Sequence, residues 1–236
     1  MKDKVDFRDK KFIAVLLLLQ ALLLTALFPG APLYGLNWAV LSLLFLGLYI
    51  LAFFWSFERC SPSAKEIALL ATMAALAAAA RVPFTVLPGV QPTTFLVMIT
   101  GSVFGAQAGF VVGALAALAS NFFLGQGPWT PWQMFCWGLG GAAAAFLTGR
   151  DREFNIGKFA LLCTAWGYIF GWIMNIWHWI GFIYPLTFKT FLATYLASFI
   201  FDTLHAAGNL LLALTFGRTF REILLRFKKK MTVDTG

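Results

Sequence analysis

The stretch AVLLLLQALLLTALF, residues 14–28, contains no charged side chain. The hydrocarbon core of a bilayer requires about 20 predominantly apolar residues for each spanning helix, and runs of this kind recur along the chain. Of the 236 residues, 60% are hydrophobic and only 12% are charged, whereas an ordinary soluble domain has about 25% charged residues. The sequence therefore predicts an all-α integral membrane protein.

Eight apolar runs follow one another and predict eight helices. They cover about residues 12–29, 37–56, 65–80, 92–105, 107–124, 132–148, 158–183 and 190–217. Almost nothing separates the run that ends at 105 from the run that begins at 107, so the sequence allows either a tight hairpin or one broken element there.

The basic residues predict the orientation of the chain. If the N-terminus is cytoplasmic, 16 of the 18 lysines and arginines fall in cytoplasmic segments, and only Arg81 and Lys189 do not. The positive-inside rule therefore places both termini in the cytoplasm. The net charge of +8 reflects this topology, and we expect no nucleic-acid partner. Charges of both signs before the first run argue against a removable signal peptide.

The third run is rich in alanine, and Ala71, Ala75 and Ala79 recur every four residues. Small residues at this spacing allow helices to approach closely in lipid. The stripe has two interpretations: internal packing within this chain, or docking of a separate membrane subunit.

A few polar residues lie within the apolar runs, where they are costly and often functional. Asp202, His205 and Asn209 share one helical face. Asp202 and His205 can lock helices through a mutual hydrogen bond or ion pair. A catalytic role is less well supported, because the pair lacks a recognisable Ser or Cys nucleophile or a third metal ligand. Asn175 and Trp179 mark a second polar face.

Three connecting segments, at about 81–93, 121–133 and 183–190, combine aromatic residues, amides, glycine and proline. The segment RVPFTVLPGVQPTTF, residues 81–95, is stiff and polar, and we interpret it as one wall or lid of a pocket between helices. Indoles and amides suit a planar or amphipathic small molecule. An interfacial aromatic belt is the alternative, and it explains Trp129 and Trp132 well.

The Ala-rich run, the segment 81–95, the stretch GSVFGAQAGFVVGALAALASNFFLGQGPWTPWQMFCWG (101–138) and the stretch FDTLHAAGN (201–209) together resemble one family. It is that of the S components, the substrate-binding membrane subunits of energy-coupling factor (ECF) vitamin transporters. The resemblance covers about residues 63–217. It implies a six-helix bundle at 63–220, preceded by a cytoplasmic N-terminus and two additional transmembrane helices in 1–62 and followed by a basic cytoplasmic tail at 221–236.

The resemblance also implies a function in the bacterial plasma membrane. Such subunits bind a vitamin and dock through an alanine stripe, here Ala71, Ala75 and Ala79, onto a transmembrane coupling protein that carries two cytoplasmic ATPases. The chain is most similar to members for cobalamin or related corrinoids, which implies a cobalamin-like vitamin as substrate, with His205 or His178 as conceivable cobalt ligands. We expect no catalytic residues, resident cofactor or metal site. Another vitamin, such as a flat heterocycle, fits the Trp and Gln content equally well.

Our main hypothesis is therefore a vitamin-capturing subunit of an ATP-driven uptake transporter. Its expected substrate-binding residues are Arg81, Gln91, Thr93, Thr94, Asn121, Gln126, Trp129, Trp132, Gln133, Asn175 and Trp179, with Asp202, His205 and Asn209 as a polar network beneath them. The rival hypotheses are an intramembrane enzyme with Asp202 and His205 as acid and base, and a membrane scaffold without a ligand.

Overall fold

The computed structural model describes residues 10–148 and 154–233, and all regular structure within these ranges is helical. The eight predicted helices are confirmed there. They are α1 (Lys10–Leu24), α2 (Trp38–Arg59), α3 (Ala64–Arg81), α4 (Pro92–Phe104), α5 (Ala106–Leu124), α6 (Trp129–Thr148), α7 (Ile156–Phe182) and α8 (Phe188–Val233). Two short 3-10 helices, η1 (Thr25–Leu27) and η2 (Pro83–Val86), lie in the connections.

Several of these helices are long and apolar enough to cross a membrane. Within the described residues there are five such segments: Trp38–Arg59, Ala64–Val86, Ala106–Leu124, Ile156–Phe182 and Phe188–Met231. Lys11–Leu24 and Pro92–Phe104 are shorter apolar helices. The chain is therefore a multi-pass membrane protein.

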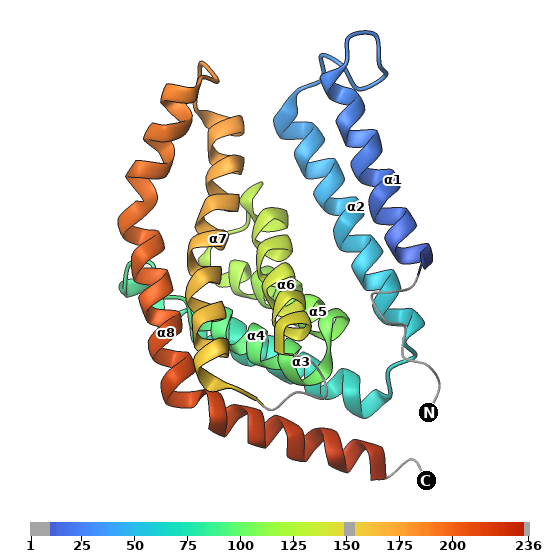
Figure 1. Cartoon of the computed structure of the whole chain (residues 1–236), viewed down its shortest axis with the longest axis vertical. Coiled ribbons are helices and arrows are strands. Elements are labelled where there is room, and N and C mark those ends of the chain that lie inside the picture. Colours follow the sequence, from blue (N-terminus) through green and yellow to red (C-terminus); the bar gives the residue numbers. More distant parts are fainter. Residues whose placement is uncertain (1–9, 149–153, 234–236) are drawn as a thin grey trace.

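The N-terminal helices α1 and α2 form a hairpin at one edge of the bundle (Figure 1, blue). α2 begins after Asn37, whose side-chain oxygen accepts the backbone N–H of Ala39 at 2.9 Å and caps the helix. Phe53 of α2 stacks on Phe110 of α5, with 3.7 Å between the ring centroids, and Phe12 of α1 packs edge-on against Phe53 at 5.2 Å. This aromatic contact attaches the hairpin to the rest of the bundle.

Helices α4, α5 and α6 approach one another closely. Gly105 alone separates α4 from α5, with a φ of 101° that favours glycine, so the chain has two helices that meet at a sharp break. Gly141 of α6 lies against Gly109 of α5, and a Cβ built on Gly141 would be 2.4 Å from the Gly109 carbonyl oxygen. A Cβ on Gly101 of α4 would be only 1.9 Å from the carbonyl oxygen of Gly141. The glycines therefore permit this crossing.

Replacing Gly141 with alanine is expected to destabilise the protein by about 1–3 kcal/mol or more, because the new methyl group meets backbone atoms that cannot rotate away. The matched control is Gly47→Ala in α2, where a Cβ meets nothing within 4 Å. Thermal unfolding in detergent, followed by tryptophan fluorescence, measures both variants. Equal unfolding midpoints for the two variants would contradict the close crossing.

Helices α7 and α8 form a long hairpin, and α8 extends beyond its predicted end. The last apolar run was expected to end at 217 and a tail to follow from 221, but the helix continues to Val233. Its final part runs at an angle to the first (Figure 1, dark red). Phe220 packs on Phe95 of α4 at 5.5 Å, and Lys228 Nζ donates to the Val103 carbonyl oxygen. Apolar residues at helical spacing therefore continue inside the basic segment, whereas residues 234–236 lie outside the described part.

Candidate functional site

A buried arginine stands at the centre of the first group of polar residues. Arg81 ends α3 and is 8% exposed. Its Nη1 donates to Ser120 Oγ and to Asn121 Oδ1, each at 2.7 Å, and its guanidinium lies 4.7 Å from the ring centroid of Trp137. The Nε atom is buried without a hydrogen-bond partner. In the described ranges, neutral oxygens and an aromatic face surround this cation, and no carboxylate pairs with it.

The same group continues into the turn between α5 and α6. Asn121 Nδ2 donates to Gln133 Oε1 at 2.8 Å and to Thr130 Oγ1 at 3.0 Å, and the Thr130 hydroxyl donates to Gln126 Oε1 at 2.9 Å. We call Arg81, Ser120, Asn121, Gln126, Thr130 and Gln133 the Arg81 cluster. The expected loop 121–133 is shorter than predicted, because Asn121 belongs to α5 and Gln133 to α6. Gly125, with φ 104°, lets the chain reverse between them.

A second buried group joins α4, α6 and α8. Trp137 Nε1 donates to Thr94 Oγ1 at 2.9 Å, and Thr94 Oγ1 lies 2.7 Å from His205 Nε2. Indole is only a donor, so the Thr94 proton remains available to His205 when that nitrogen is unprotonated. We call Thr94, Trp137 and His205 the Thr94 cluster. The Arg81 guanidinium also lies over the face of the Trp137 ring, and this contact links the Thr94 cluster to the Arg81 cluster.

Replacing Thr94 with valine removes the hydroxyl that Trp137 and His205 share. Each buried polar group left without a partner costs about 1–3 kcal/mol, so we expect a clear fall in the unfolding midpoint in detergent. Thr85→Val is the control, because the Thr85 hydroxyl is exposed and bonds only the nearby Val82 carbonyl. Equal midpoints for both variants would show that the Thr94 cluster contributes nothing to stability.

Asp202 belongs to a third group, at the α7–α8 hairpin. Ser198 Oγ donates to Asp202 Oδ2 at 2.9 Å, and Asn175 Nδ2 donates to Ser198 Oγ at 2.6 Å. The carboxylate lies so close to Gly171 that a Cβ there would be 1.9 Å from Asp202 Oδ1. This group borders a groove of about 470 Å³, which we call the hairpin groove. It is lined by Asn175, His178, Ile183, Thr190, Ala193, Thr194, Ala197, Ser198 and Phe201.

The single network expected for Asp202, His205 and Asn209 does not form, and neither does the mutual Asp202–His205 bond. Each residue has its own partner: Asp202 accepts from Ser198 of the same helix, His205 pairs with Thr94 of α4, and Asn209 Nδ2 donates to the Cys163 carbonyl oxygen of α7 at 3.0 Å. The three residues do share the buried face of α8, as the spacing predicted. They point to successive neighbours along that face because a helix advances 1.5 Å with each residue.

The remaining predicted residues are distributed over several places. Trp179 Nε1 donates to Thr190 Oγ1 at 3.0 Å beside the hairpin groove, whereas Trp129 packs edge-on against Trp177 at 6.2 Å. The Thr93 hydroxyl donates to the Ala77 carbonyl and fixes α4 to α3. Gln91, just before α4, has a buried Oε1 without a partner.

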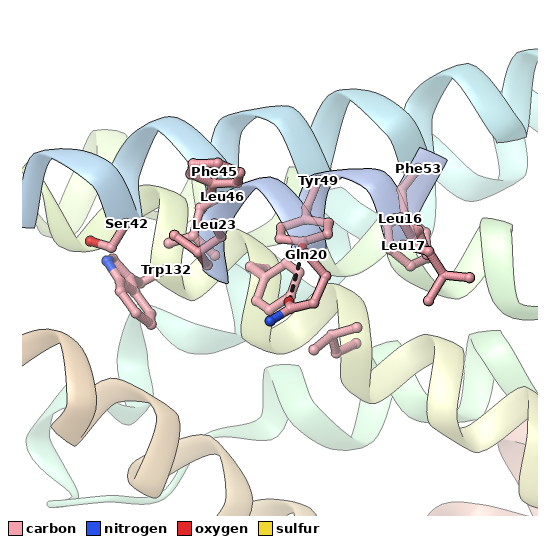
Figure 2. Close-up of a pocket in the computed structure, with 12 residues that line it drawn as sticks. Leu16, Leu17, Gln20, Leu23, Ser42, Phe45, Leu46, Tyr49, Phe53 and Trp132 are labelled. Carbon is pink, nitrogen blue, oxygen red and sulfur yellow. Dashed lines mark hydrogen bonds between the residues drawn. The ribbon is translucent and has the colours of Figure 1, made fainter. Parts of the chain in front are cut away.

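Trp132 faces away from the Arg81 cluster. It lines a second groove, of about 500 Å³, between α6 and the N-terminal hairpin (Figure 2). We call this the N-terminal groove, and its lining residues are Leu16, Leu17, Gln20, Leu23, Ser42, Phe45, Leu46, Tyr49, Phe53, Trp132, Phe135 and Leu139. Consecutive residues of a helix point in different directions, so Trp132 and Gln133 serve different sites.

Sequence reasoning missed several polar partners. Trp137 lies one turn after Gln133 on the same face of α6, and that spacing could have identified it. Ser120 precedes the predicted Asn121 near the end of α5, and the side-chain oxygens of both residues accept hydrogen bonds from Arg81. Ser198, four residues before Asp202, had the spacing of a helical neighbour.

Residues 61–221 match the family described as "ECF-type riboflavin transporter, S component". The match covers 161 of the 236 residues. The chain belongs to this family. No curated protein and no solved structure matches the chain.

An S component is the substrate-binding membrane subunit of an ECF vitamin transporter and not an enzyme, in agreement with our prediction. The family name does not support the expected preference for cobalamin, and it agrees better with the alternative of another vitamin. The match begins just before α3, so α1 and α2 lie outside the S-component family match.

The alanine stripe of this S component lies on the surface of α3. Ala71, Ala75 and Ala79 are exposed, whereas Ala74 and Ala78 of the neighbouring row are buried against the bundle. Internal packing, one of the two interpretations of the stripe, therefore describes the buried row of Ala74 and Ala78 and not the exposed row. The exposed row leaves a smooth face on which another helix can lie closely.

Proposed function

We propose that this S component captures a flat heterocyclic vitamin of the riboflavin type in the hairpin groove. The groove, with its amide and hydroxyl groups at Asn175, Thr190 and Ser198, is the observation that supports this site. Its volume of about 470 Å³ lies within the range of about 300–1,000 Å³ that is usual for pockets of small ligands. A corrinoid is several times larger than a three-ring vitamin and suits the groove less well.

The segment 81–95 packs against α8, the helix that provides one side of the groove. Gly89 packs on α8 so closely that a Cβ there would lie 2.5 Å from the carbonyl oxygen of Phe201, which itself lines the groove. Residues 87–91 are not among those that line the groove, so in our proposal they pack behind the vitamin site and fix the position of α8 there through Gly89. The Arg81 and Thr94 clusters hold the two ends of this segment, at α3 and α4.

The distribution of basic residues supports a proposed arrangement in the membrane. We propose that residues 63–220 form the six-helix substrate-binding bundle, that α1 and α2 are additional to it, and that both termini are cytoplasmic. The hairpin groove then opens toward the outside, where the vitamin is captured. The stripe of Ala71, Ala75 and Ala79 contacts a transmembrane coupling protein, and two cytoplasmic ATPases bound to that protein supply the energy.

A binding assay with the purified full chain tests the proposal. Riboflavin quenching of intrinsic fluorescence, without ATP, is expected to saturate at one ligand per chain, and cobalamin is expected not to compete. Saturable binding of cobalamin but not of riboflavin would restore the corrinoid hypothesis. Absence of saturable binding to a panel of vitamins would overturn the site.

A further inference from the structure

The N-terminal groove lies on a part of the molecule that the vitamin site does not use. It separates the hairpin of α1 and α2 from α6, and the aromatic contact of Phe53 with Phe110 closes it at one end. Figure 2 shows Leu16, Leu17 and Phe53 together at that end and Ser42 and Trp132 at the other. Ser42 and Phe53 are 11 residues apart on α2, which corresponds to a length of about 16 Å along the helix. The groove is therefore elongated along α2, a helix long and apolar enough to cross the membrane, and apolar side chains make up most of its lining.

The polar groups of the groove are almost all satisfied within the protein. Tyr49 donates its hydroxyl to Gln20 Oε1 at 3.0 Å, and the Ser42 hydroxyl donates to the Ala39 carbonyl at 2.7 Å. Trp132 differs, because it is only 7% exposed and its Nε1 is buried without an acceptor. A buried indole N–H usually has a hydrogen-bond partner. The groove therefore needs one acceptor at the Trp132 end and apolar atoms along the rest of its length.

We propose that the N-terminal groove holds one acyl chain of a phospholipid, whose ester carbonyl accepts the Trp132 N–H. The acyl chain of the lipid extends along Phe45, Tyr49 and Leu16 toward Phe53. Trp132 and Ser42 lie near the first residues of α6 and α2, so in the orientation proposed above they are at the outer interface, at the depth of the glycerol esters. The lipid belongs to the outer leaflet and fills the space between α6 and the N-terminal hairpin of α1 and α2. This gives α1 and α2 a role outside the matched family region: they form a lipid site on the transport subunit.

The test measures retained lipid in single-residue variants of the full chain. The protein is reconstituted in nanodiscs of dioleoyl phosphatidylglycerol and phosphatidylethanolamine, extracted with mild detergent and measured by native mass spectrometry. We expect about one phospholipid per chain for the wild type. Leu17→Trp at the Phe53 end and Ser42→Phe at the Trp132 end should each lower retention at least fivefold. Trp132→Phe, which removes the donor, should lower it two- to fivefold.

Leu18→Trp is the matched control, because Leu18 is 68% exposed on the same helix, next to Leu17 at 64%, and does not line the groove. It should retain lipid as the wild type does. A wild type without retained lipid overturns the proposal, and so does equal retention in Leu17→Trp and Leu18→Trp. If Ser42→Phe fails to fold, the comparison of the two exposed leucine variants still decides the outcome. Vitamin binding should be unchanged in Leu17→Trp, so this result is independent of the vitamin site.

Discussion

Replacing Ala197 with tryptophan is expected to lower the affinity for the vitamin at least a hundredfold while the protein remains folded. Ala197 is an exposed residue of α8 that lines the hairpin groove. An indole there occupies a large part of the 470 Å³ and lies where the ligand ring would contact the wall. A loss of about 2.8 kcal/mol of binding free energy is sufficient for a hundredfold change in affinity. Fluorescence titration of the purified variant with riboflavin measures the effect.

The neighbouring residue provides the control for this prediction. Leu196 is 67% exposed on the same helix but does not line the groove, so Leu196→Trp adds the same indole on a different face. It should bind riboflavin as the wild type does. Similar affinity in both variants would place the vitamin outside the hairpin groove, even if the chain still binds it.

The number and class of the helices could be predicted from sequence because lipid imposes a simple rule. A spanning helix must be apolar along about 20 residues, and each interruption of the apolar pattern marks a connection. The rule fails where a helix leaves the membrane. Residues 221–233 are basic, but Phe220 and Leu224 continue the helical period and pack on the bundle, so α8 extends through a segment expected to be a tail.

The candidate site was harder to predict. A polar residue in an apolar run shows that a polar group is buried at a cost in free energy, but it does not identify the residue that forms a hydrogen bond with it. Arg81, Asn121 and Gln133 are joined by hydrogen bonds, whereas their expected role in substrate binding stays a prediction. Asp202 and His205 share a face but do not bond to each other, because Asp202 accepts from Ser198 of the same helix and His205 pairs with Thr94 of α4. Trp132 and Gln133 are adjacent in sequence, but Trp132 lines the N-terminal groove whereas Gln133 hydrogen-bonds within the Arg81 cluster. Assigning them required the rotation of α6, which follows from tertiary packing.

The stripe on α3 carries the second large effect that we expect. Replacing Ala75 with tryptophan should weaken association with the coupling protein by roughly a hundredfold and abolish vitamin uptake, while vitamin binding by the isolated subunit is unchanged. Ala75 is exposed in the middle of the row formed by Ala71 and Ala79. Helices that pack through alanine approach to about 8–10 Å between axes, and an indole at the centre of the row prevents this approach. Co-purification of the variant with the coupling protein and the ATPases measures the association.

Leu76→Trp is the control that separates docking from a general effect of a bulky residue on α3. Leu76 follows Ala75, is 43% exposed and lies outside the alanine row. It should therefore retain association and uptake. If Ala75→Trp and Leu76→Trp assemble equally well, the alanine row does not contact the partner. If Ala75→Trp loses vitamin binding as well as assembly, the change has damaged the bundle itself. The stripe acts in docking only if vitamin binding survives and association does not, because α3 then presents its exposed face to the partner while its buried face packs on the bundle.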